Sequence, residues 1–192
     1  MTSEIHGIAK NTFWLTSAEF INAVAGIITG IVLVRYLGAN DYGIYGFVIS
    51  FVSLFAIFSN FGVTALMVNE LSRDRQLVNK YLDNLVLLKL LMGITTAILI
   101  VSVLAFTHKP LEIQLLVYIM TFGLILTAMA EPFTAIIRVF QEMQYEAFLK
   151  VTGVLLTLLS VLFVAQLRLS LLFLITAAVA INAILLLVAI TL

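Results

Sequence analysis

Three ionisable side chains lie inside long apolar stretches of this 192-residue sequence: Glu19, Lys89 and Glu131. A charged side chain deep in a lipid-facing helix costs roughly 2.5 to 3.5 kcal/mol, so such residues generally face protein or a water-filled cavity. Two carboxylates and one ammonium at a common depth would form a mutually neutralising cluster, or a cavity wall that exchanges protons and meets a charged substrate. A structural ion pair, such as Glu19 with Lys89, explains the same residues equally well.

Neutral polar residues recur at helical spacing on the same faces as these charges. Two amides, Asn22 and Asn60, could add hydrogen bonds to a ligand. The glycines and hydroxyls that accompany them are Gly26, Gly30, Gly43, Gly46, Ser50, Ser53, Thr64, Gly93, Thr96 and Thr127. Small residues in such stripes let helices approach closely and form hydrogen bonds. We therefore expect packing, rather than ligand binding, to account for the glycine, serine and threonine positions.

The residue types required by common catalytic sites are sparse. The two histidines, His6 and His108, fall on opposite sides of the expected membrane, and the sequence has no cysteine. The nucleotide-binding and HExxH metal-binding motifs are absent as well. We expect a protein that is not an enzyme and that needs neither a cofactor nor a metal.

The composition indicates which elements position these side chains. Hydrophobic residues make up 63% of the chain and charged residues 10%, which excludes an ordinary water-soluble domain. Ten basic and ten acidic residues give a net charge of zero, so nucleic acid is not an expected partner.

Crossing about 30 Å of hydrocarbon takes roughly 20 apolar residues in a helix. The sequence predicts an all-α, polytopic membrane protein with a single bundle of six transmembrane helices spanning residues 1–192. The expected helices are approximately 12–34, 42–68, 82–106, 115–137, 150–167 and 169–190. Because the last apolar run reaches Leu192 without a polar flank, the sequence resembles part of a longer protein.

Basic residues near the membrane predict the orientation, because cytoplasmic connections retain more of them. One side would carry six, namely Lys10, Arg73, Arg75, Lys80, Arg138 and Lys150, and the other three, namely Arg35, Lys109 and Arg168. This bias places both termini in the cytoplasm. Within the fourth expected helix, Pro132 removes a backbone hydrogen bond. It would therefore form either a hinge or a fixed kink.

The stretch from Arg35 to Arg75 carries several short sequence motifs in combination. It contains R-x-L-G at Arg35, D-Y-G-x-Y at Asp41, an F-G pair at Phe61 and an acidic-then-basic loop at 70–75. Tyr81, Asn84, Lys89 and the segment FQEMQYEA at 140–147 continue the pattern. The sequence thus resembles the polysaccharide-biosynthesis proteins, the oligosaccharide-lipid flippases of the multidrug/oligosaccharidyl-lipid/polysaccharide exporter superfamily. This chain looks like the N-terminal lobe.

The resemblance implies transport of an isoprenoid diphosphate-linked oligosaccharide across the cell membrane by two six-helix lobes around a central cavity. Lys89 would bind the diphosphate. Glu19 and Glu131 would accept sugar hydrogen bonds or be protonation sites that couple transport to an ion gradient, Asn22 and Asn60 would add neutral hydrogen bonds, and Arg35 at the opposite mouth would assist release. The coupling ions would be protons or sodium ions.

The partners expected from this resemblance are the lipid-linked oligosaccharide, membrane lipids, and a second lobe supplied by the missing C-terminal half, a homodimer or a partner subunit. The alternatives are a related drug or lipid exporter, and a non-transporting membrane scaffold for polysaccharide assembly.

Overall fold

A computed structural model describes residues 2–60, 62–73 and 78–192 of the chain, and all regular secondary structure in these ranges is helical. The helices are α1 (Thr2–Asn60), α2 (Val63–Arg73), α3 (Val78–Phe106), α4 (Leu111–Val139), α5 (Met143–Leu167) and α6 (Leu171–Thr191). Five helical segments are long and apolar enough to cross a membrane. The chain is therefore an all-α, multi-pass membrane protein, as predicted.

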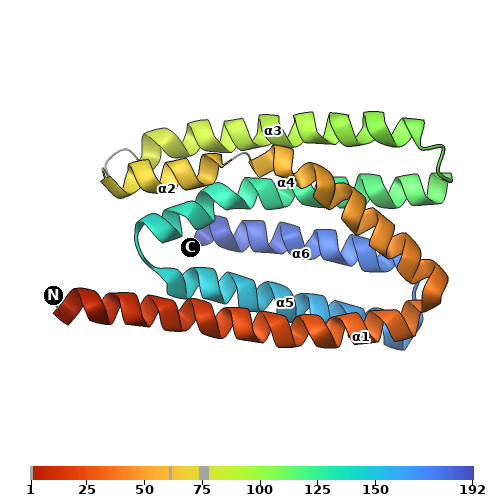
Figure 1. The fold of residues 1–192 in the computed structure, drawn as a ribbon, viewed down its shortest axis with the longest axis horizontal. Helices are drawn as coiled ribbons and strands as arrows, with labels where there is room; N and C mark the ends of the chain where they lie inside the picture. The colour runs from red at the N-terminus through yellow and green to blue at the C-terminus, as the bar shows by residue number, and fades with distance from the viewer. Residues whose placement is uncertain (1, 61, 74–77) are drawn as a thin grey trace.

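Helix α1 is bent back on itself at Gly38. Its 59 residues would extend about 90 Å if straight, roughly three times the hydrocarbon thickness. Gly38 interrupts the helical backbone with φ 69° and ψ −179°, and α1 reverses direction there (Figure 1). We call residues 2–37 the first arm and residues 39–60 the second arm. The two arms correspond to the first two expected helices, but one residue, rather than a loop at 35–41, separates them.

The second expected helix, 42–68, is not continuous, which corrects the prediction. Helix α1 ends at Asn60 and α2 begins at Val63. Gly62 has φ 71°, a left-handed conformation that interrupts an α-helix and that glycine adopts readily. Asn60 and Gly62 are residue types that commonly end a helix, but the prediction carried the helix through them because the apolar run resumes at Val63. Phe61 and Arg75 lie outside the described residues, as do the side chains of Arg73 and Lys80.

The helical passes run alternately in opposite directions. The start of α1, the α4–α5 connection and the end of α6 lie at one end of the bundle, which we call the terminal end (Figure 1). The bend at Gly38 and the α3–α4 and α5–α6 connections lie at the other, the bend end. The two termini therefore share one end, and their cytoplasmic placement remains a prediction.

Three apolar clusters hold the described helices together, and two of them contain most of the clustered buried residues. The larger includes Leu33, Val52, Ile100, Val117 and Val161, and it joins both arms of α1 to α3, α4 and α5. The smaller, built around Met67, Leu71, Leu85, Ala135 and Val139, packs α2 against α3 and α4. Together they fix the positions of the polar side chains described below.

Glycines divide into packed and unpacked positions. A Cβ atom on Gly123 would lie 3.0 Å from Val179 Cγ2, and one on Gly153 would lie 3.0 Å from Leu185 Cδ1, so both sit at close helix contacts. By contrast, a Cβ on any of four glycines of α1 would meet nothing within 4 Å; these are Gly26, Gly30, Gly43 and Gly46. Within the described residues these four positions therefore face open space and make no close helix contact.

Candidate functional site

Lys89 and Glu131 form a buried ion pair. The side chain of Lys89 on α3 is only 1% exposed, and that of Glu131 on α4 is 24% exposed. The ammonium of Lys89 donates to the Glu131 carboxylate, to the Ser59 carbonyl at 3.2 Å and to Asn60 Oδ1 at 3.0 Å. An ammonium has three donors, and all three are engaged. Lys89 therefore has no donor left for a ligand in this arrangement.

The pair also holds the junction between α1 and α2. Ser59 and Asn60 are the last residues of α1, where backbone carbonyls lack partners within the helix and a cation is favourable. On the other side of the junction, the Thr64 hydroxyl donates to Glu131 Oε2 at 3.0 Å. Lys89 and Glu131 thus anchor the ends of two helices to α3 and α4, which is a structural role.

Glu19 belongs to a different network from Lys89, so the predicted Glu19–Lys89 pair is wrong. Glu19 Oε1 instead accepts from Lys150 Nζ at 2.6 Å. The first arm packs beside α5, whereas α3 lies across the bundle (Figure 1). The predicted common depth of the three charged groups did not indicate which helices are neighbours.

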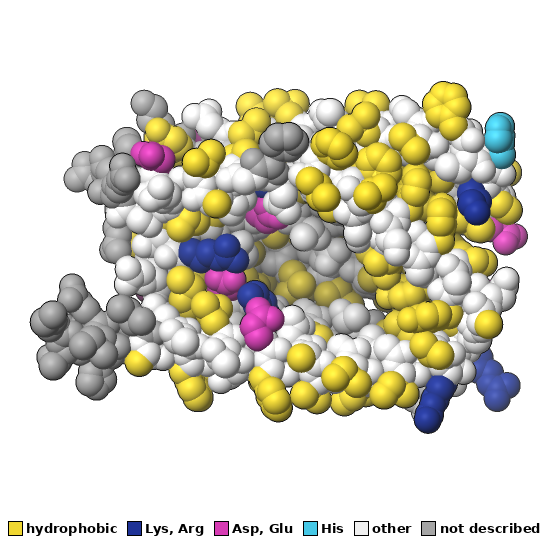
Figure 2. Space-filling view, in the orientation of Figure 1, with side chains coloured by type: hydrophobic (Ala, Val, Ile, Leu, Met, Phe, Trp, Pro, Cys, Tyr) yellow, Lys and Arg dark blue, Asp and Glu magenta, His cyan; other side chains and the backbone are white. Residues whose placement is uncertain are grey.

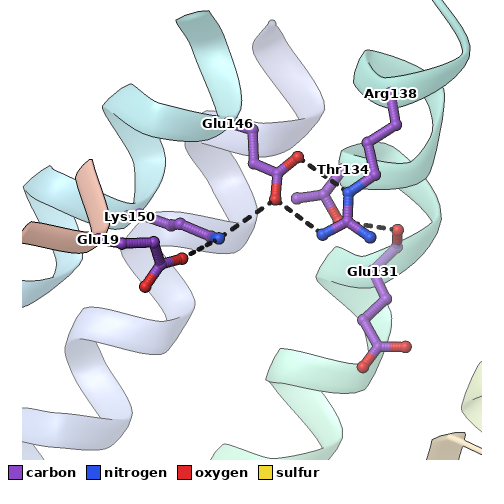
Figure 3. A network of polar contacts seen from close by, with 6 residues as sticks. All are labelled: Glu19, Glu131, Thr134, Arg138, Glu146 and Lys150. Carbon is purple, nitrogen blue, oxygen red and sulfur yellow. Dashed lines mark hydrogen bonds and ion pairs between the residues drawn. The ribbon is translucent and has the colours of Figure 1, made fainter. Parts of the chain in front are cut away.

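A second charged network joins α4, α5 and the first arm (Figure 3). Arg138 holds Glu146 through two hydrogen bonds, Nε to Oε2 at 2.9 Å and Nη2 to Oε1 at 2.7 Å. Lys150 lies between Glu146, at 3.5 Å, and Glu19. The Glu146 side chain is 6% exposed, but Arg138 is 43% exposed and Lys150 34% exposed. Both cations can therefore be reached from solvent while a buried carboxylate holds them in place.

Sequence reasoning missed Glu146 because helix α5 begins at Met143 rather than near 150. With the correct start, Glu146 and Lys150 are four residues apart on one helical face, a spacing typical of ion pairs. That spacing, together with Arg138 at the end of the preceding helix, is the signal that could have identified the network.

The face between the two arms of α1 is hollowed, and charged side chains gather beside the hollow toward the terminal end (Figure 2). One cavity of about 280 Å³, which we call the charged cavity, is lined by Glu131, Arg138, Glu146 and Lys150. A second of about 480 Å³, the neutral cavity, lies between both arms, α5 and α6. A third of about 180 Å³ reaches Asn60. All three share Asn182, the amide of α6 that sequence reasoning also missed.

The remaining predicted residues lie in separate places. Asn22 lines the neutral cavity, and Asn60 is a partner of Lys89. Arg35 is exposed, three residues before the bend at Gly38. Pro132 is buried and α4 stays helical across it, so its role as a hinge remains a prediction.

Comparison with known families decides the broad identity of the chain. A family model described as polysaccharide biosynthesis protein matches residues 8–192. The chain belongs to this family. No curated protein and no solved structure matches it. As a polysaccharide biosynthesis protein, it carries a charged cavity and a neutral cavity on one face of a transmembrane bundle, an arrangement that could hold a ligand with both charged and uncharged parts.

Proposed function

We propose that the chain is the N-terminal half of a secondary transporter that moves isoprenoid diphosphate-linked oligosaccharides from the cytoplasmic to the outer leaflet. The observation that carries this proposal is the charged cavity, in which two partly exposed cations line a hollow in an otherwise apolar bundle. A diphosphate is too polar for hydrocarbon, and the Arg138 guanidinium and the Lys150 ammonium in this cavity are donors suited to phosphate oxygens. The bundle would act with a second lobe, either from the same gene product, a second copy or a partner subunit.

The cations proposed to bind the diphosphate are Lys150 and Arg138. Lys89 has three acceptors already, whereas Lys150 is held partly by Glu19, whose side chain is 58% exposed. An exposed carboxylate is a weak competitor, since surface ion pairs contribute about 0 to 1 kcal/mol. An incoming diphosphate would therefore displace Glu19 from Lys150 while Glu146 continues to hold Arg138. The released Glu19 carboxylate would then be free to bind a cation, which links transport to an ion gradient.

The Lys150→Gln variant tests this assignment. Charge-assisted hydrogen bonds contribute about 1.5 to 3 kcal/mol, so the rate of transfer should fall roughly tenfold to hundredfold. Folding should be retained, because Glu146 keeps both bonds from Arg138 and Glu19 is largely solvated. The measurement is transfer of a lipid-linked oligosaccharide by the full gene product in proteoliposomes.

Lys10→Gln is the matched control, because it removes one exposed positive charge from the first arm outside the three cavities. Its rate should equal that of the unmodified protein. Equal rates for Lys150→Gln and Lys10→Gln would contradict the assignment. If the unmodified protein moved no substrate but polysaccharide assembly still required it, a scaffold would replace a transporter as the explanation. The Lys89→Ala variant cannot distinguish a transporter from a scaffold, because loss of the buried Lys89 ammonium would disturb folding itself.

A further inference from the structure

The neutral cavity has the chemistry of a carbohydrate site. We propose that it binds the sugar part of the transported lipid and selects sugars without charge, an inference that rests on the proposed function. Its polar lining comes from Asn22, Thr29, Tyr42, Tyr45, Thr157 and Asn182, which lie on both arms of α1, on α5 and on α6.

Several polar side chains of this lining have donors or acceptors that are not used within the described structure. An amide or a phenol can both donate and accept, as sugar hydroxyls do. Within the part of the chain that the structure describes, the side chains of Asn22 and Tyr45 make no hydrogen bond. Thr157 donates to the Gly153 carbonyl at 2.9 Å, which leaves its oxygen able to accept. Polar groups in a membrane need a partner, and hydroxyls of a ligand or water would supply it.

The cavity also offers space and an aromatic wall. A Cβ atom on Gly26 or Gly30 would meet nothing within 4 Å, so these glycines widen the cavity rather than allow a helix contact. The rings of Tyr42 and Tyr45 lie 6.4 Å apart, tilted by 33°. At about 480 Å³, the volume falls within the range of small-molecule sites, roughly 300 to 1,000 Å³.

The neutral and charged cavities differ in the charge of their linings. The lining of the neutral cavity contains no Asp, Glu, Lys or Arg, whereas the charged cavity holds two of each sign. A sugar carboxylate placed in the neutral cavity would lose water without gaining a counter-ion, which is costly. The cavity therefore discriminates against acidic sugars.

The two cavities also fix the direction of the substrate. On α5, Thr157 follows Lys150 by seven residues, which is about 10 Å along the helix axis toward the bend end. Both cavities reach Asn182 and Leu185 on α6, so they are adjacent. The diphosphate thus lies toward the terminal end, and the sugars extend toward the bend at Gly38.

Thiol protection tests this arrangement, because residues 1–192 contain no cysteine, so each variant adds a single thiol to this part of the protein. Thr157→Cys reports on the neutral cavity, Thr134→Cys on the charged cavity, and Asn40→Cys is an exposed control outside the three cavities. The rate of reaction with a water-soluble maleimide is measured with maltotriose, with trigalacturonate and with inorganic pyrophosphate, on the same protein preparation used for transfer.

Maltotriose should slow labelling of Thr157→Cys several-fold and leave Asn40→Cys unchanged, whereas trigalacturonate should protect Thr157→Cys far less. Adding Asn22→Leu should abolish this protection, because it removes an amide that forms no hydrogen bond with the described residues. Equal protection by both sugars, or none by maltotriose, would overturn the neutral-sugar site. Pyrophosphate should slow only Thr134→Cys. If only the pyrophosphate experiment failed, the result would contradict diphosphate binding in the charged cavity, and hence the proposed function, but not the sugar site.

Discussion

Replacing Glu131 by Leu is expected to destabilise the protein by about 3 to 5 kcal/mol, because it leaves the Lys89 ammonium buried without its counter-ion. The Lys89 side chain is 1% exposed, so water cannot replace the lost carboxylate. Lys89→Met should cost less, since the Glu131 side chain is 24% exposed and still accepts from Thr64. The measurement is the thermal unfolding midpoint of the purified protein in detergent, followed by helical circular dichroism.

Two further variants make this prediction specific to the buried pair. The double variant Lys89→Met with Glu131→Leu should recover much of the stability, because an apolar pair of similar size carries no desolvation cost. Glu19→Leu, which removes an acidic residue from the exposed pair with Lys150, should cost no more than about 1 kcal/mol. The structural role of the pair is refuted if the double variant is no more stable than Glu131→Leu.

Gly38→Ala should be similarly damaging, with a loss of about 3 kcal/mol or failure to fold. The Gly38 backbone has φ 69° and ψ −179°, a combination that is essentially restricted to glycine and strains other residues by about 1 to 3 kcal/mol. Any relaxation would change the angle between the arms and so displace Leu33 from Val48 and Val52 in the larger apolar cluster. Yield of folded protein and its unfolding midpoint are the measurements.

Gly43→Ala is the matched control for the bend. Gly43 lies five residues away in the second arm, where a Cβ would meet nothing within 4 Å. Alanine favours a helix over glycine by roughly 0.5 to 1 kcal/mol, so this variant should be unchanged or slightly more stable. A Gly38→Ala protein as stable as Gly43→Ala would show that the bend does not depend on the glycine conformation.

The sequence predicted the helical fold well because apolar length is a property of each segment alone. It did not locate the interruption at Gly62, since the apolar run resumes at Val63 and the prediction carried the helix through Asn60 and Gly62. It also placed the start of the fifth helix seven residues late, because Glu146 and Lys150 interrupt the apolar pattern. In the structure both are helical and bind partners on other elements.

The site was harder to predict for a different reason. Periodicity gives the depth of Glu19, Lys89 and Glu131 along their helices, but not which helices are neighbours. The first arm packs against α5, and α3 packs against α4, so the expected cluster divides into two ion-pair networks (Figures 1 and 3). Asn182 was overlooked because it is a single neutral amide in an otherwise apolar helix. Only the assembled bundle brings the three cavities together around it.

The sharp reversal at Gly38 has a consequence for how the protein is made. Consecutive membrane passes usually emerge from the ribosome separated by a polar loop, so that each can enter the bilayer in turn. Here the first arm continues into the second through one non-helical residue. We therefore expect the first 60 residues to insert as a helical hairpin, with both passes released into the lipid as one unit.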